Sequence, residues 1–189
     1  MIQIKNAAEL QKMRKACAIS AAALKAGGEA IEPGITTAEI DKIIYDFIVR
    51  HGARPNFLHL YGFPATACIS VNDTVIHGIP SKQQQIRPGD IVSIDTGCKI
   101  DGFNGDNACT YACGKIDLEA QRLLDVTKES LHRGIEMARG GNRVGDIGHA
   151  VQSYVEENGF SVVRSFVGHG VGKELHEDPE VPNFGNAGR

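Results

Sequence analysis

The sequence lacks the usual marks of a membrane or secreted protein. It has no stretch of about 18 consecutive apolar residues, so it predicts no membrane-spanning helix. Its first residues lack the basic, apolar and small-residue pattern of a secretory signal, which argues against export. Its five cysteines are odd in number and form no Cys-x-x-Cys pair, a usage that suits a reducing compartment. We therefore expect a cytoplasmic protein.

A strong charge and low-complexity segments are also missing. The formal net charge of −3 gives no positive field for binding nucleic acid. Glycine and proline are scattered and mark no linker. Hydrophobic residues make up 42% of the 189 residues, which is ordinary for a globular chain of one-domain size. The sequence predicts a single domain over residues 1–189, with no nucleic-acid or membrane partner.

Two helix-capping patterns open the first half of the chain. In each, Asn or Thr is followed three residues later by Glu, at positions 6–9 and 36–39, which is a capping box. The first helix is expected to run toward Gly28 and the second to end near Gly52. Apolar side chains recur at helical spacing on one face of the second helix, at Ile40, Ile43, Ile44, Phe47 and Ile48.

Strand and turn signals fill the middle of the chain. Residues 67–71 and 91–95 are predicted strands, and residues 75–77 are expected to be short and extended. Asp101-Gly102 is a two-residue hairpin signal, after which strand residues resume through Cys113. These patterns predict an α/β fold.

Helical spacing returns after Asp117 and predicts two more helices, followed by a β-like stretch at residues 161–167. The first of these helices should bury one face, made by Leu124, Thr127, Leu131, Ile135 and Ala138. The second should bury Ile147, Val151, Tyr154 and Val155 and end at Asn158-Gly159.

The two halves of the chain resemble each other. Gly34 is separated from Gly141 by the same interval as Gly52 from Gly159, and apolar positions between these glycines match. We interpret this as a duplicated α/β half rather than a chance likeness of two amphipathic helices. The stretch that follows Gly159 is only about half as long as the one from Gly52 to Cys113. The repeat therefore predicts a second half that lacks strands at the C-terminus, including the counterpart of the hairpin in the first half.

The hairpin places two carboxylates together. With a two-residue turn, Asp95 faces Ala108 and Asp106 faces Gly97. Side chains alternate between faces, so Asp95 and Asp106 are diagonal neighbours on one face. Two close carboxylates repel unless a proton or cation lies between them, and hard divalent metals prefer such oxygens. For the pair alone, a metal site and two solvated aspartates on an exposed hairpin both remain open.

Three histidines have contexts that suit a site. His169 follows the predicted apolar stretch and lies between glycines, His77 ends an extended segment before Gly78, and His176 lies in a loop. The other four have ordinary contexts and receive no role: His51, His59, His132 and His149.

Taken together, these motifs resemble those of bacterial type I methionine aminopeptidases. The resemblance covers the whole chain, in order, and rests on Val71-Asn72-Asp73, His77-Gly78-Ile79-Pro80, Asp95-Thr96-Gly97, Asp101-Gly102-Phe103-Asn104-Gly105-Asp106, Gly168-His169-Gly170-Val171-Gly172 and His176-Glu177-Asp178-Pro179. It implies the pita-bread fold, two pseudo-symmetric α/β halves with antiparallel sheet and flanking helices. It also implies removal of the initiator methionine from nascent proteins and peptides when the next residue is small.

The resemblance further implies a metal centre and a set of roles. Asp95, Asp106 and His169 would be ligands of two divalent ions, with manganese, cobalt, iron and zinc all suitable. Asp106 would bridge the ions. His77 would contact the substrate amide, and His176 would hydrogen-bond the scissile carbonyl oxygen.

A methionine pocket and two further ligands complete what the resemblance implies. Phe63, Cys68 and Leu175 match pocket positions, although Leu175 stands where the family often has an aromatic residue. The family needs two more glutamate ligands, which are expected beyond Arg189. The expected partners are the nascent polypeptide N-terminus and the ribosome, and the expected oligomeric state is a monomer.

Three other functions are considered beside this one. The chain could be an inactive fragment of such an enzyme, or a non-catalytic pita-bread module that binds peptide or the ribosome. It could also be a proline-specific peptidase of the same fold. The presence of all five polar site residues argues against the non-catalytic module. Proline-specific peptidases usually carry an extra N-terminal domain, whereas this chain is expected to start directly at its first helix, so we favour the methionine aminopeptidase for the parent protein.

Overall fold

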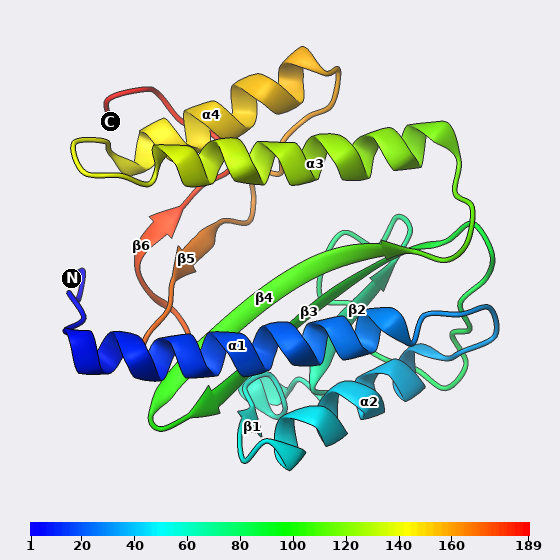
Figure 1. Ribbon diagram of the computed structural model, residues 1–189. Helices are drawn as coiled ribbons and strands as arrows, with labels where there is room; N and C mark the ends of the chain where they lie inside the picture. Colours follow the sequence, from blue (N-terminus) through cyan, green and yellow to red (C-terminus); the bar gives the residue numbers. More distant parts are fainter. The chain divides into compact units, whose positions relative to one another are not determined.

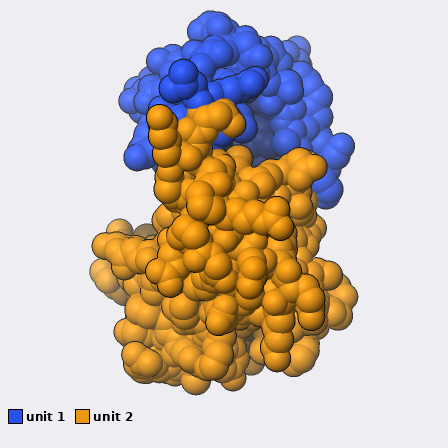
Figure 2. Space-filling view, turned by 90° about the vertical axis from the view of Figure 1, so that its right-hand side faces the viewer, with its two compact units in different colours: residues 1–3, 118–170, 176–189 blue, residues 4–117, 171–175 orange.

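The computed structural model describes all residues, 1–189, and the chain divides into two compact units. Unit 2 comprises residues 4–117 and 171–175, and unit 1 comprises residues 1–3, 118–170 and 176–189 (Figure 2). The sequence prediction of a single domain stays a prediction. None of the helices is both long enough and apolar enough to cross a membrane.

Unit 2 pairs two helices with an antiparallel sheet (Figure 1). The helices are α1 (Ala7–Glu29) and α2 (Thr37–Arg50), and both begin with the predicted capping boxes. The strands are β1 (Arg54–Pro55), β2 (Ala67–Val71), β3 (Ile91–Ile100) and β4 (Phe103–Ala112), with a short 3-10 helix, η1 (Leu60–Gly62), between β1 and β2. Strand β3 pairs with β4 along its length and with both β1 and β2. The predicted mixed α/β architecture is confirmed.

The core of unit 2 lies between the helices and the sheet. The apolar face of α2 is fully buried at Ile40, Ile44 and Ile48, as its periodicity predicts. Helix α1 lies directly on β4, because a Cβ at Gly105 would be 2.5 Å from the backbone of Ala16. Glycine at 105 therefore lets helix and strand approach closely, and this contact fixes which face of the hairpin points to the helices.

The predicted hairpin register is confirmed at every position. Ile100 pairs with Phe103, Asp95 with Ala108, and Asp106 with Gly97. Strand β3 is longer than predicted and continues to the turn.

Unit 1 contains helices α3 (Leu118–Met137) and α4 (Val144–Glu157) and a two-stranded ribbon of β5 (Gly168–Gly170) and β6 (Glu177–Val181). The predicted apolar face of α3 is wrong. Val126, Ser130 and Gly134 are buried, whereas Leu131 and Ile135 are each 58% exposed. Small residues take the helix–helix contact, and a Cβ at Gly134 would lie 3.0 Å from Val151 of α4.

Two strand predictions also fail. Residues 161–167 form no strand, and only Gly168–Gly170 pairs, so His169 lies within a short strand rather than after a long one. Residues 75–77 lie in a loop in which His77 has φ 58°, so this residue is left-handed rather than extended. In both segments the apolar residues are not matched by a neighbouring strand, and β propensity alone does not make a strand.

Candidate active site

The two aspartates share one face of the β3–β4 hairpin. Cys98, on the other face, donates its thiol hydrogen to the carbonyl oxygen of Ala16 in α1. Since Asp95 is an odd number of residues from Cys98, and Asp106 pairs with Gly97, both carboxylates point away from α1. The predicted diagonal pair is therefore formed in unit 2.

In the absence of a cation, Asp95 keeps its proton to a higher pH than an isolated carboxyl group. Burial, the charge of Asp106 and a side-chain hydrogen bond to Asp106 raise the pKa of Asp95 to about 7. Two carboxylates held this close cannot both ionise cheaply, and a divalent cation would replace the proton. The donor set fits such an ion, since it offers adjacent, partly buried carboxylate oxygens.

Cys68 lies next to Asp95 on the neighbouring strand. Its side chain is buried, and burial together with the charges of Asp95 and Asp106 raises the pKa of the Cys68 thiol to about 12. The thiol therefore stays protonated at neutral pH. It acts as a small apolar group on this face rather than as a nucleophile.

The loop that carries His77 is fastened to β2. Ile69 donates its N–H to the carbonyl oxygen of Gly78 at 2.8 Å, and Gly78 donates to Ser70 Oγ at 3.0 Å. A Cβ at Gly78 would be 2.1 Å from the carbonyl oxygen of Ile69, so only glycine permits this contact. The exposed His77 side chain is thereby held beside the strand that pairs with the Asp95 strand.

The three predicted methionine-pocket residues do not line one hollow in the structure. Leu175 lines a hollow of about 390 Å³ in unit 2 with Leu58, Leu60 and the buried Asn104, whereas Phe63 and Cys68 do not line it. Sequence reasoning missed the two leucines, because their loop has no periodic signal. His59 and Tyr61 in this loop have left-handed backbone conformations, which the sequence does not mark.

Asn104 is a further residue whose role sequence reasoning missed. Its buried amide donates to the carbonyl oxygens of Gly172 at 2.8 Å and Lys173 at 2.9 Å. It thus ties residues 171–175 to β4. The sequence did hold one signal for this role, because Asn104 lies within the motif at residues 101–106. A buried Asn must satisfy its hydrogen bonds, which in this protein go to residues 172 and 173.

The two histidines of unit 1 lie together. The ring of His169 is 4.3 Å from that of His176, centroid to centroid. His169 Nδ1 lies 2.9 Å from the carbonyl oxygen of Gly170. If Nδ1 donates that bond, its proton is fixed there and Nε2 carries the lone pair, which is the tautomer of a histidine metal ligand. A Cβ at Gly170 would be 2.5 Å from the carbonyl oxygen of Asp178, so the predicted need for glycine beside His169 is met.

The predicted site residues therefore fall into an acidic pair with Cys68 and His77 in unit 2, and a histidine pair in unit 1. No group of three or more His, Cys, Asp or Glu side chains gathers in the chain to hold a metal ion. Paired carboxylates and histidines on a mixed α/β frame are the kinds of side chain that metal-dependent hydrolases use, and this is the class that the site indicates.

Comparison with known proteins narrows that class. The family model of metallopeptidase family M24 matches residues 11–189, and the chain belongs to this family. A methionine aminopeptidase of Clostridium perfringens is 53% identical over 189 residues, which is 100% of this chain and 76% of the relative. Methionine aminopeptidase 1 of Bacillus subtilis is 46% identical over 185 residues, 98% of this chain and 74% of the relative.

A solved structure agrees with the sequence relatives. The crystal structure of a methionine aminopeptidase from Thermotoga maritima matches with a TM-score of 0.98 and 41% identity, covering 100% of this chain and 76% of that one. The pita-bread fold implied by the motif resemblance is thus confirmed. The resemblance to methionine aminopeptidases, and the enzyme class that it implies, are confirmed as well.

Proposed function

We propose that this chain is a metal-dependent aminopeptidase that removes the N-terminal methionine from nascent proteins and peptides whose second residue is small. The observation that carries this is the adjacent, half-buried and hydrogen-bonded pair Asp95 and Asp106 in a chain 53% identical to a methionine aminopeptidase. A binding scaffold has no use for two carboxylates held at such electrostatic cost.

Asp95, Asp106 and His169 would hold the divalent ions. A divalent ion supplies a Lewis acid that polarises the scissile carbonyl and lowers the pKa of water. Manganese, cobalt, iron and zinc all accept carboxylate and imidazole ligands. The hydrogen bond between His169 Nδ1 and Gly170 supports this role, because it aims Nε2 as the ligand atom.

The remaining site residues bind and orient the substrate. His77, held by the Gly78 contacts to β2, contacts the substrate amide. His176 donates a hydrogen bond to the scissile carbonyl oxygen and stabilises the charge that develops there. Cys68, Phe63 and Leu175 offer apolar surface to the methionine side chain, whose flexible thioether fits an irregular slot.

The proposed setting follows from the substrate. Initiator methionine is removed from chains as they emerge, so we infer that this protein acts on nascent N-termini near the ribosome, in the cytoplasm, as a monomer. The five cysteines, all of them free, suit a compartment in which thiols stay reduced.

The test is release of methionine from a Met-Ala-Ser peptide by the 189-residue chain, with and without manganese. We expect release that depends on added metal and is abolished by a chelator. The N-acetylated peptide is the matched control and should be untouched, because an aminopeptidase needs the free amine. A folded chain that releases no methionine with any of the four metals would show that it is a non-catalytic module or an inactive fragment.

A further inference from the structure

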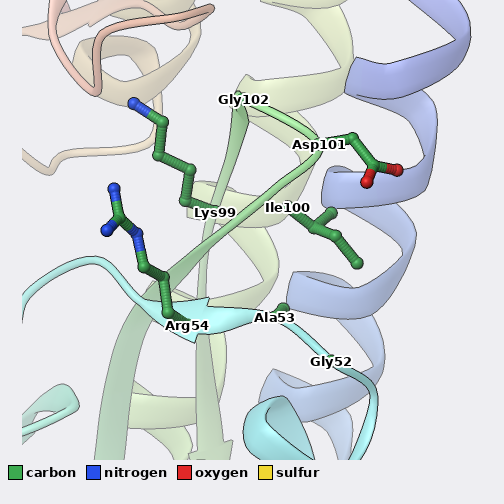
Figure 3. Close-up of a pocket in the computed structure, with 7 residues that line it drawn as sticks. All are labelled: Gly52, Ala53, Arg54, Lys99, Ile100, Asp101 and Gly102. Carbon is green, nitrogen blue, oxygen red and sulfur yellow. The ribbon is translucent and has the colours of Figure 1, made fainter.

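Two cationic side chains of unit 2 stand opposite each other at the end of the sheet. Arg54 of β1 pairs with Lys99 of β3. The Arg54 guanidinium and the Lys99 amine point to the same side of the strands, away from the Asp101 carboxylate (Figure 3). Like charges directly opposite across a strand pair are destabilising. This arrangement therefore costs stability unless an anion accompanies it.

No acid of the chain compensates this pair. Arg54 takes part in no side-chain hydrogen bond and no ion pair, and Lys99 donates to a backbone carbonyl, that of Lys173, at 2.6 Å. The nearest turn acid, Asp101, is bound by Lys15 at 2.7 Å. Glu174 lines the adjoining hollow, but one acid leaves the two cations with a net positive charge.

Arg54 and Lys99 also mark the junction of two hollows. One, of about 310 Å³, is lined by Arg54, Lys99 and the hairpin turn (Figure 3). The other, of about 390 Å³, is the hollow lined by Leu58, Leu60 and Leu175. Both are open to solvent. An extended chain can therefore pass from the hollow that holds these leucines over the two cations.

The distance from the acidic pair sets where a peptide would meet these cations. Asp95, Gly97 and Lys99 lie on one face of β3, and Asp106 pairs with Gly97. At about 3.4 Å per residue, Lys99 lies roughly 7 to 14 Å along the strand from the acidic pair. An extended peptide has the same rise. With its first peptide bond at the acidic pair, its third to fifth residues reach Lys99.

We propose that Arg54 and Lys99 form a subsite for the carboxylate of an Asp or Glu side chain at the third, fourth or fifth position of the substrate peptide. This rests on the proposed function and adds a specificity determinant to it. The guanidinium supplies a planar fork of donors that matches a carboxylate, and the ammonium supplies a second donor beside it. The subsite favours acidic nascent chains.

The test compares peptides that differ only in whether one side chain ends in a carboxylate or in an amide. Peptides beginning Met-Ala carry glutamate or glutamine at the third, fourth or fifth position, with neutral residues elsewhere, and are assayed with manganese at low salt. We expect one position at which glutamate raises kcat/KM roughly 3- to 10-fold over glutamine, the size expected for a partly exposed ion pair. Added salt should erase that ratio.

The variants locate the effect. Arg54→Gln and Lys99→Gln should each bring the ratio toward one while leaving hydrolysis of a C-terminally amidated Met-Ala-Ser peptide, which has no carboxylate, unchanged. Arg54→Glu should invert the preference toward a lysine at the same position. Lys82→Gln, which removes an exposed cation elsewhere in unit 2, is the matched control and should keep the ratio.

The outcomes separate this inference from the proposed function. Equal rates for glutamate and glutamine at all three positions, with methionine still released, would overturn the subsite alone. If no peptide is cleaved, the function fails, and the anisotropy of fluorescent peptides then measures binding directly. Tighter binding of the glutamate peptide, lost in Arg54→Gln, supports the subsite, and equal binding overturns it.

Discussion

The helix pair of unit 1 is built on the same plan as the helix pair of unit 2. Helices α2 and α4 each have 14 residues, and they begin at Thr37 and Val144, three positions after the repeat glycines Gly34 and Gly141. These glycines have φ angles of 97° and 95°. A carboxylate three residues after each N-cap accepts the N-cap N–H, at 2.9 Å in α2 and 2.7 Å in α4. The duplication inferred from sequence is thus visible in backbone detail.

The two pairs differ in what covers them. The α2 face is fully buried, whereas the α4 counterparts Ile147 and Val151 are only half-buried. Unit 2 sets its helices against a four-stranded sheet, while unit 1 has a two-stranded ribbon. Helices α2 and α4 therefore share an apolar pattern but differ in burial, because the sheet that each helix packs against decides how much apolar surface is buried.

This difference bears on where the chemistry lies. The acidic pair, which is costly to hold, belongs to the unit with the larger core and the longer paired strands. Charged groups kept together against repulsion need a scaffold that does not relax. The ribbon of unit 1 contributes histidines, which carry no such cost when neutral.

The largest expected effect is on the free energy of unfolding, when the same substitution is made at two equivalent positions of the repeat. Ile40→Ala should lower the free energy of unfolding by about 3–4 kcal/mol, because Ile40 is fully buried in the unit 2 core. Ile147→Ala, at the equivalent position of α4, should cost only about 1–2 kcal/mol, because its surroundings can collapse or admit water. Urea unfolding followed by circular dichroism measures both. Equal losses would mean that the two helix pairs are covered alike.

The acidic pair should make the metal-free protein less stable as pH rises. The folded pKa of Asp95, about 7, exceeds its unfolded value of about 3.9. The contribution of this group to stability is therefore full below about pH 4, falls as the pH rises, and is gone above about pH 7. Asp95→Asn removes this titration. We expect the variant to be more stable than the native chain by about 1–3 kcal/mol at pH 8 and by nothing near pH 4.

Thermal melts of chelator-treated protein at the two pH values provide the measurement. Asp73→Asn, an exposed turn residue of the same unit, is the control and should shift neither melt. Asp95→Asn should also abolish metal-dependent release of methionine, so a variant that gains stability loses activity. A stability gain of the same size at pH 4 and pH 8 would contradict the raised pKa of Asp95.

Local patterns in the sequence predicted much of this fold. Capping residues located α1 and α2, and the Asp101-Gly102 turn fixed the register that brings Asp95 beside Asp106. Both signals act within a few residues, so the sequence displays them directly. The repeat also matched α4 to α2.

Features that depend on contacts between distant segments were not predicted. The buried stripe of α3 is made by Val126, Ser130 and Gly134, because α4 approaches over small side chains, and apolar periodicity pointed to a neighbouring face of the helix. Likewise, Asn104 acts through residues 172 and 173, and the Arg54–Lys99 pair exists only through strand pairing. Neither partner can be identified without the fold.

The smallest expected effect comes from replacing one glycine in each helix pair, where the two helices approach each other. Gly27 and Gly134 are equivalent positions of the repeat. A Cβ at Gly27 would lie 2.7 Å from the fully buried Ile44, and one at Gly134 would lie 3.0 Å from the half-buried Val151, the repeat equivalent of Ile44. Alanine in place of a helical glycine gains about 1 kcal/mol. Overpacking at Gly27 should outweigh this gain, so Gly27→Ala lowers stability by about 1 kcal/mol.

At Gly134 the half-buried Val151 can shift, so Gly134→Ala should leave stability unchanged or raise it by about 0.5 kcal/mol. Parallel urea titrations of the two variants measure this difference, with m-values checked for equal slopes. Opposite signs at equivalent glycines would show that two helix pairs of one design differ in how tightly they are packed. A loss of the same size at both would place unit 1 under the same packing constraint as unit 2.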